Sequence, residues 1–307
     1  MSFFAPPQAI EAQVFATLPD RFRRRDMPPG RAASGRSVPS EGCFLEGPSF
    51  DRAGNLYVTD IPYGRVFCIS PAAEWTLVAE YEGEPNGLKI HRDGRIFITD
   101  YRNGVMLLEP SSGRVTPLLT GYNAERFKGV NDLVFAGNGD LYFTDQGQTG
   151  LQDPTGRVHR LRAEDGRLEL LADNLPSPNG LVLNGAEDVL YVAVTRANAV
   201  WRLPLLPDGR VSRMGLFVQL SGGRGPDGLA MDEADGLAVA HPDMGAAWVF
   251  DRRGEPLFRV RSPRSEVVTN LAYGGPGNRT LHVVDSVAGC ILTAELPTPG
   301  RWLFSHA

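Results

Sequence analysis

Short apolar runs and turn residues alternate along the whole chain, and the alternation recurs in similar units. In one unit, the apolar run LKI at 88–90 is followed by a turn and by RIFITD at 95–100. Two such runs joined by Asp-Gly, Asn-Gly or a similar pair predict a β-hairpin. A third and a fourth run follow, here GVMLLEP and VTPLLT. Each unit is therefore predicted to form a sheet of four antiparallel strands.

Six such units occupy most of the chain. Successive units are 38, 45, 48, 48 and 42 residues apart, and repeats of about 40 to 50 residues with several strands each are typical of β-propeller blades. We therefore predict an all-β fold, a six-bladed propeller that forms one domain over residues 1–307. The units align on the apolar residue that follows their first turn: Phe50, Leu88, Leu133, Leu181, Leu229 and Leu271.

Either end of the chain offers a strand that could close the ring. QVFATL at 13–18 resembles the fourth strands of the units, and TPGRWLFSHA at 298–307 follows the sixth unit. We favour the N-terminal segment, because a closing strand from the opposite terminus leaves no exposed sheet edge. Residues 20–44, rich in Arg, Pro, Gly and Ser, do not fit the repeat. We expect a long surface loop there, or a segment folded over one mouth of the ring, since it leads directly into Glu46.

Composition narrows the class of protein. The chain is 42% hydrophobic and 22% charged, and its net charge of −5 comes with no long basic block apart from RFRRR at 21–25, which argues against a nucleic-acid partner. No apolar stretch approaches the roughly 18 residues of a membrane span, and no secretory signal pattern is visible. We expect a cytoplasmic protein with three free thiols, because the cysteines show no CxxC spacing. Its oligomeric state stays open.

Oxygen-bearing residues recur where the first strand of each unit begins. In a propeller these strands line the central channel, so residues at one repeat position form a ring. An Asn or Asp before Gly also forms turns, which explains any single copy. Two carboxylates in one ring repel each other unless a proton or a cation intervenes, and carboxylate and amide oxygens suit a hard ion, Ca²⁺ first, with Mg²⁺ or Mn²⁺ as alternatives. The ring comprises Glu46, Asn86, Asn131, Asn179 and Asp227, with Asn270 nearby.

A second ring follows from hairpin geometry, because each second strand returns to the mouth at which the first began. We expect its aspartates to cap the turn into the third strand. Asp145 and His241 are kept as candidates for contact with a ligand, His241 because it breaks the pattern. The ring comprises Asp60, Asp100, Asp145, Val194, His241 and Asp285.

Four short motifs, in order within six blades, resemble one family. They are EGP at 46–48, ND at 131–132, PNG at 178–180 and PDG at 226–228. From about residue 44 to 296 the chain resembles the senescence-marker-protein/gluconolactonase/luciferin-regenerating-enzyme family, which includes regucalcin and is related to diisopropylfluorophosphatase. The resemblance implies a six-bladed propeller with one divalent metal, Ca²⁺ first and Zn²⁺, Mn²⁺, Mg²⁺ or Fe²⁺ as alternatives. Its implied ligands are Glu46, Asn131, Asn179 and Asp227, with Asn86 left as a substrate contact.

The resemblance also implies a reaction, the hydrolysis of a small lactone that is sugar-derived or related. A metal would polarise the lactone carbonyl and activate water, with Asp227 as general base or, alternatively, as nucleophile. Sugar lactonases similar to regucalcin have an arginine two residues before the ligand Asn, where this chain has Gly129. Arg102 is a candidate to compensate for it.

Three other functions remain open. The same site could hydrolyse organophosphates or other esters, which a substrate panel would separate from lactone hydrolysis. A non-catalytic binding propeller with NHL-type repeats has a similar strand pattern but no reason to gather these four motifs. A condensing enzyme similar to strictosidine synthase is more distant, because it needs a positioned Glu instead of a metal site.

Overall fold

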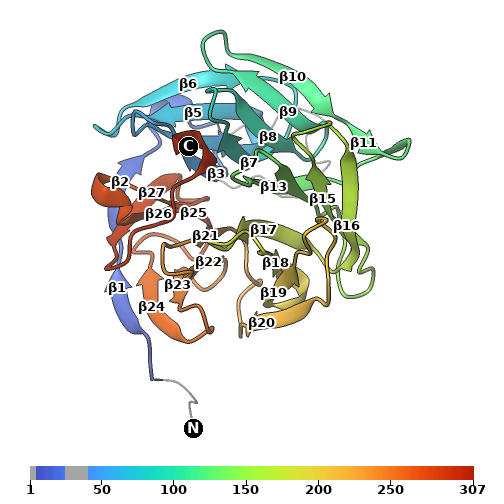
Figure 1. The fold of residues 1–307 in the computed structure, drawn as a ribbon. Helices are drawn as coiled ribbons and strands as arrows, with labels where there is room; N and C mark the ends of the chain where they lie inside the picture. Colours follow the sequence, from blue (N-terminus) through green and yellow to red (C-terminus); the bar gives the residue numbers. More distant parts are fainter. Residues whose placement is uncertain (1–4, 25–40) are drawn as a thin grey trace.

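Six sheets surround a common centre in the computed structural model, which describes residues 5–24 and 41–307 (Figure 1). The fold is a six-bladed β-propeller, as the repeat predicts. Each helix in these two ranges is a 3-10 turn of three residues. None of the helices there is long and apolar enough to cross a membrane.

In blades one to five, the four antiparallel strands come from one repeat unit. From the channel outward, blade one contains β3 (Leu45–Phe50), β4 (Leu56–Asp60), β5 (Arg65–Ile69) and β6 (Trp75–Glu80). Blade two contains β7 (Pro85–Ile90), β8 (Ile96–Asp100), β9 (Gly104–Glu109) and β10 (Arg114–Leu119). Blade three contains β13 (Val130–Phe135), β14 (Leu141–Asp145), β15 (Gly156–Leu161) and β16 (Leu168–Leu175). A small hairpin of β11 (Gly121–Tyr122) and β12 (Glu125–Arg126) precedes blade three.

The other three blades follow the same plan. Blade four contains β17 (Pro178–Leu183), β18 (Val189–Val194), β19 (Ala199–Pro204) and β20 (Gly215–Gln219). Blade five contains β21 (Leu229–Met231), β22 (Leu237–His241), β23 (Ala246–Phe250) and β24 (Pro256–Arg261). Blade six contains β25 (Val268–Gly274), β26 (Thr280–Asp285) and β27 (Cys290–Glu295). The 3-10 turns are η1 (Asp20–Phe22), η2 (Ile61–Tyr63), η3 (Thr195–Ala197), η4 (Pro276–Asn278) and η5 (Phe304–His306).

The N-terminal segment closes the ring. Strand β2 (Gln13–Thr17) pairs antiparallel with β27 as the fourth strand of blade six, which confirms the expectation for residues 13–18. Strand β1 (Gln8–Glu11) continues onto the neighbouring blade, where it pairs parallel with β24. The N-terminal segment thus joins the outer edges of two adjacent blades. The C-terminal segment joins no sheet as a named strand and instead crosses one end of the channel (Figure 1).

Apolar contacts between neighbouring blades hold the ring together. Each of the six core clusters combines residues from two adjacent blades, as Val66 of blade one does with Leu88 and Ile98 of blade two. Burial of these alternating side chains from water is the main favourable contribution to such a fold. Because all six interfaces are equivalent, the first strands converge on the axis and bring their N-terminal residues to one mouth.

Polar side chains of the second strands tie each blade to the next. The hydroxyl of Thr144 donates to the carbonyl of Asn179 at 2.8 Å, and that of Thr59 donates to the carbonyl of Asn86 at 2.6 Å. The neighbouring aspartates accept backbone N–H groups at the start of their own blade, for example Asp60 from Phe44 at 2.8 Å. These contacts fix the height at which each first strand begins.

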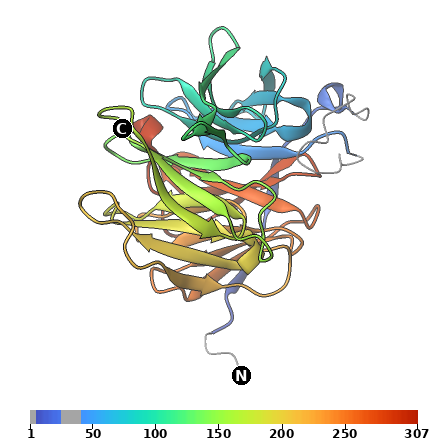
Figure 2. The same ribbon diagram turned by 90° about the vertical axis from the view of Figure 1, so that its right-hand side faces the viewer.

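The segment predicted as a loop at 20–44 is described at its two ends, and residues 25–40 lie outside the described part. In the described ends, the Arg24 N–H donates to the carbonyl of Gly42 at 2.9 Å, and the Arg65 guanidinium donates to the carbonyl of Phe22 at 2.6 Å. Figure 2 shows η1 and the C-terminal end of the chain on opposite faces of the propeller.

Candidate active site

A pocket of about 730 Å³ lies at the mouth where the first strands begin. We call it the upper pocket. Asn179 and Asp227 are part of its wall, so two of the four predicted ligands face the same space. The rest of the wall comes from loops of several blades and includes Phe44, Tyr101, Gln146, Gln148, Ser177, Thr195, Arg196 and Thr269.

Glu46 begins the channel-lining part of β3 and is only 3% exposed. Its Oε2 accepts the N–H of Gly47 and the side-chain amide of Asn270, both at 2.8 Å. Burial raises the pKa of Glu46, and the negative charge of Asp132 raises it further. A buried carboxyl in this setting gains from a nearby cation, which would favour its charged form.

Asn131 has its side-chain orientation fixed by a neighbour. Its Nδ2 donates to Oε1 of Gln146 at 2.7 Å, and Nε2 of Gln146 donates in turn to the hydroxyl of Ser177 at 2.9 Å. With the nitrogen held on that side, Oδ1 of Asn131 is turned to the other side. Gln146 therefore determines which atom of the Asn131 amide is available as a ligand.

Asn179 has a buried oxygen that needs a partner. The residue is 5% exposed, and its Oδ1 accepts no hydrogen bond within residues 5–24 and 41–307. A buried polar atom left unpaired costs about 1–3 kcal/mol, so such atoms mark places where a ligand or ion binds.

Gly180, which follows Asn179, is required because two backbone segments come close together there. PNG at 178–180 forms the start of β17 beside a shift in strand register and is not a separate turn. A Cβ at Gly180 would lie 2.4 Å from the backbone carbonyl oxygen of Asp227, so glycine is needed where blades four and five approach.

Asp227 is half-buried and precedes β21. Its backbone is fixed from both sides, because its N–H donates to the carbonyl of Ala240 at 3.0 Å and its carbonyl accepts the N–H of Gly180 at 3.2 Å. A carboxylate that is rigidly held, partly solvated and exposed to the upper pocket is suited to accept a proton from a reacting water.

Asp132, Asn270 and Lys89 extend the polar site down the channel. Nδ2 of Asn270 lies 3.4 Å from a carboxylate oxygen of Asp132, as well as bonding Glu46. Nζ of Lys89 lies 3.7 Å from the other Asp132 oxygen. The Asn270 oxygen accepts the N–H of Leu271 at 2.8 Å, so it is already engaged and Asn270 acts as a clamp.

Sequence reasoning missed these roles, although each had a signal. Asp132 stands where blades two, four and five have glycine, and a Cβ at Gly87 would lie 2.4 Å from its carboxylate. Lys89 is one of only two lysines in the chain and interrupts an apolar first strand. The contact between them crosses from one blade to the next, so only the assembled ring shows it.

The other predicted contacts lie elsewhere. Asn86 is buried in the first-strand ring, while the exposed Arg102 is not part of the wall of the upper pocket. Asp145 is fully buried and accepts the N–H of Gly129 at 2.8 Å, which is the capping role expected for its ring. His241 is buried, and burial lowers its pKa. Its Nδ1 accepts the indole N–H of Trp248 at 3.2 Å, and Nε2 faces the Gly222 carbonyl at 3.0 Å, so both ring nitrogens have partners within the protein.

Tyr101 occupies the space near Gly129, the position where regucalcin-like sugar lactonases are expected to have an arginine. A Cβ at Gly129 would lie 2.4 Å from the Tyr101 ring, and Gly129 has a φ of +146°, so a larger residue does not fit there. The Tyr101 hydroxyl accepts a hydrogen bond from Gln148 at 2.7 Å. An aromatic ring and an amide thus form this side of the upper pocket.

The residues present fit a divalent cation. Within the two described ranges, no three His, Cys, Asp or Glu side chains are grouped as metal ligands. The predicted set has only two carboxylates, Glu46 and Asp227, and is completed by amide oxygens. The unpartnered Oδ1 of Asn179 and the fixed orientation of Asn131 are the features that such an all-oxygen site requires.

Comparisons with known proteins agree with this architecture. A sequence model of the SMP-30/Gluconolactonase/LRE-like region matches residues 44–286. The chain is 29% identical to lactonase drp35 of Staphylococcus epidermidis over 236 residues, which are 74% of this chain and 72% of that protein. The fold is similar to a gluconolactonase from Xanthomonas campestris (TM-score 0.73, 22% identity, 84% of this chain and 86% of that one). It is also similar to the calcium-binding protein regucalcin from Agrobacterium tumefaciens (TM-score 0.74, 20% identity, 97% and 98%).

Proposed function

The chain belongs to the SMP-30/gluconolactonase/LRE-like family, and from this premise we propose that it hydrolyses small lactones with a divalent metal ion bound at the upper pocket. The observation that supports this most is the buried Oδ1 of Asn179, which has no hydrogen-bond partner among the described residues and lies in the same pocket wall as Asp227. The similarity to lactonase drp35 supports the substrate class. We assign the ion to Glu46, Asn131, Asn179 and Asp227, with Ca²⁺ as the first candidate.

The mechanism follows from the residues at the pocket. A bound divalent ion supplies a Lewis acid that polarises the lactone carbonyl and lowers the pKa of water. Asp227 accepts a proton as the water oxygen attacks the carbonyl carbon. The ring C–O bond then breaks, and Asp227 returns the proton to the departing alkoxide, which leaves a hydroxy acid. Asn270 and Gly47 hold the Glu46 carboxylate, and Gln146 holds the Asn131 amide.

The residues that line the upper pocket indicate which kind of lactone would fit there. Gln146, Gln148 and Arg196 offer hydrogen bonds to hydroxyl groups, which suits a sugar-derived ring. Tyr101 and Phe44 add flat apolar surface to the same wall. We therefore propose a small lactone with at least one hydroxyl group, and δ-gluconolactone is the first substrate to test.

The test is a substrate panel with metal control. Purified protein is stripped with EDTA, dialysed, and assayed with δ-gluconolactone, γ-butyrolactone and a fluorophosphonate, each with Ca²⁺, Mn²⁺, Mg²⁺ or Zn²⁺ restored. We expect the protein to hydrolyse lactones and EDTA to abolish this activity. The variants Asp227→Asn and Glu46→Gln should be inactive. Asp208→Asn, at a surface carboxylate whose side chain is 51% exposed, is the matched control. Turnover of the fluorophosphonate alone would favour the organophosphatase alternative, and undiminished lactone hydrolysis after chelation would refute the metal site.

A further inference from the structure

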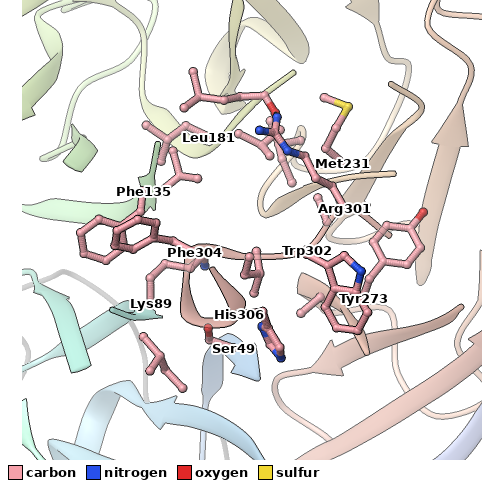
Figure 3. Close-up of a pocket in the computed structure, with 18 of the residues that line it drawn as sticks. Ser49, Lys89, Phe135, Leu181, Met231, Tyr273, Arg301, Trp302, Phe304 and His306 are labelled. Atoms are coloured by element: carbon pink, nitrogen blue, oxygen red, sulfur yellow. The ribbon is translucent and has the colours of Figure 1, made fainter. Parts of the chain in front are cut away.

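A second cavity, of about 360 Å³, lies at the opposite end of the channel. We call it the lower cavity. It shares no lining residue with the upper pocket, and its wall includes the distal residues of all six first strands. The C-terminal residues 301–307 form its outer side, and Figure 3 shows this segment crossing from Arg301 to His306.

The C-terminal segment is anchored on several blades. The Arg301 N–H donates to the carbonyl of Met231 at 2.9 Å, and its guanidinium pairs with Glu187 at 2.7 Å. Phe304 stacks on Phe135 with ring centroids 5.2 Å apart, and the hydroxyl of Ser305 donates to the carbonyl of Phe50 at 3.0 Å. Because these contacts hold both ends of the C-terminal segment in place, the outer wall of the lower cavity is fixed.

The wall of the lower cavity is mostly apolar, with Leu181, Met231 and Phe135 among its residues. Several polar side chains interrupt it, and two of them, Ser49 and Lys89, lie on the first strands of adjacent blades. The Ser49 hydroxyl is fully buried and has no hydrogen-bond partner in the described part of the chain. Lys89 is 15% exposed and uses its ammonium toward Asp132 and the carbonyl of Leu88, which leaves one of its three N–H groups for a further acceptor.

We propose that the lower cavity binds a small neutral molecule that is mainly hydrocarbon and has one carbonyl or hydroxyl oxygen. Asp132 already balances the charge of Lys89, so a carboxylate ligand would place an excess negative charge in a largely apolar space. A pure hydrocarbon would leave the Ser49 hydroxyl unpaired.

Size defines the ligand further. An apolar protein cavity of about 150 Å³ accommodates benzene, so a cavity of more than twice that volume suits a molecule of roughly ten to twelve heavy atoms. Medium-chain ketones, alcohols and esters have this size and this single polar group. The two spaces share no lining residue, so binding here can be tested separately from the proposed lactone hydrolysis.

Isothermal titration with decan-2-one as the neutral probe and decanoate as the charged probe tests the proposal. We expect saturable 1:1 binding of decan-2-one by the full chain and at least ten-fold weaker binding of decanoate. Met231→Trp fills the lower cavity and should abolish the binding, and Ser49→Ala should weaken it several-fold. Leu216→Trp, which adds the same ring at a site that is 54% exposed, should bind like the wild type.

Thermal melting establishes that Met231→Trp is folded. If it is not, Ala230→Leu, a smaller addition to the same wall, takes its place. The proposal is overturned if the wild type shows no saturable binding of decan-2-one. It is equally overturned if a folded cavity-filling variant binds as tightly as the wild type, since the ligand would then lie elsewhere, for example in the upper pocket.

Discussion

Replacing Gln146 with leucine tests whether the upper pocket is a metal site. The Gln146 amide is 9% exposed and links two buried groups, accepting from Asn131 at 2.7 Å and donating to Ser177 at 2.9 Å. In Gln146→Leu the Asn131 nitrogen loses its acceptor, which costs about 1–3 kcal/mol if the amide keeps its orientation. If the Asn131 amide instead rotates to form a hydrogen bond with another group, its oxygen no longer lies where it could bind the metal ion.

Either outcome weakens an ion bound by the Asn131 oxygen. Changes to residues that orient a metal ligand typically lower metal affinity about 10–100-fold, which agrees with a penalty of about 1–3 kcal/mol. We therefore expect the Ca²⁺ dissociation constant of Gln146→Leu to rise by about that factor. The measurement is calorimetric titration of Ca²⁺ into protein stripped with EDTA, which needs no substrate.

Gln148→Leu is the matched control. Gln148 lies in the same pocket and loses the same amide, but its Nε2 donates to the Tyr101 hydroxyl at 2.7 Å, whereas Gln146 holds the amide of Asn131. We expect its Ca²⁺ affinity to stay within about two-fold of the wild type, because no proposed ligand changes its orientation. Equal Ca²⁺ affinity of wild type, Gln146→Leu and Gln148→Leu would refute the role assigned to Asn131, and a wild type that binds no divalent ion would refute the metal site itself.

Three further predictions concern stability. Arg65→Met should lower the free energy of unfolding in urea by about 3–5 kcal/mol, because it leaves the fully buried Asp60 without its ionic partner, whereas Arg167→Met, at a side chain 70% exposed, should change it by less than about 0.5 kcal/mol. Burial lowers the pKa of His159 to about 4, so below pH 6.5 the unfolded chain takes up a proton that the folded chain does not, and stability falls toward pH 4. His159→Phe should therefore raise the melting temperature more at pH 5 than at pH 8, and an equal gain at both would contradict the assignment. Saturating Ca²⁺ should raise the melting temperature of the stripped wild type but not of Asn179→Leu, because an ion that binds only the folded state stabilises it.

The fold could be predicted because the repeat specifies it six times. A hairpin signal in one unit is ambiguous, but six units at one period determine both the blade and the number of blades. The same register places Glu46, Asn131, Asn179 and Asp227 at the start of their first strands. Positions set by local turns and strand period are therefore accessible from the sequence.

Contacts between blades were not accessible in the same way. The approach of Lys89 to Asp132, and the clamp of Asn270 on Glu46, join residues 43 and 224 positions apart. Tyr101 is placed against Gly129 by the packing of neighbouring blades. No local pattern encodes these distances, because they depend on the diameter of the ring and on side-chain orientation across it.

The strand that closes the ring also determines where the C-terminal segment lies. Because β2 completes blade six, residues 298–307 are not needed as its fourth strand. Phe304 is instead buried against Phe135 at one end of the channel, whereas Trp302 stays 54% exposed. The end opposite the predicted site is therefore covered by the chain itself.

The charges along the channel give an independent reason to expect a divalent ion. The buried carboxylates of Glu46 and Asp132 are joined through the side-chain amide of Asn270, and the ammonium of Lys89 lies beside Asp132. Lys89 carries one positive charge against these two negative charges, and an excess negative charge in a buried space is unfavourable. Burial and the charge of Asp132 raise the pKa of Glu46, which favours its protonated form. A cation bound by the Glu46 carboxylate would favour the ionised form instead, so the charges of these buried groups and the oxygen ligands lead to the same kind of ligand.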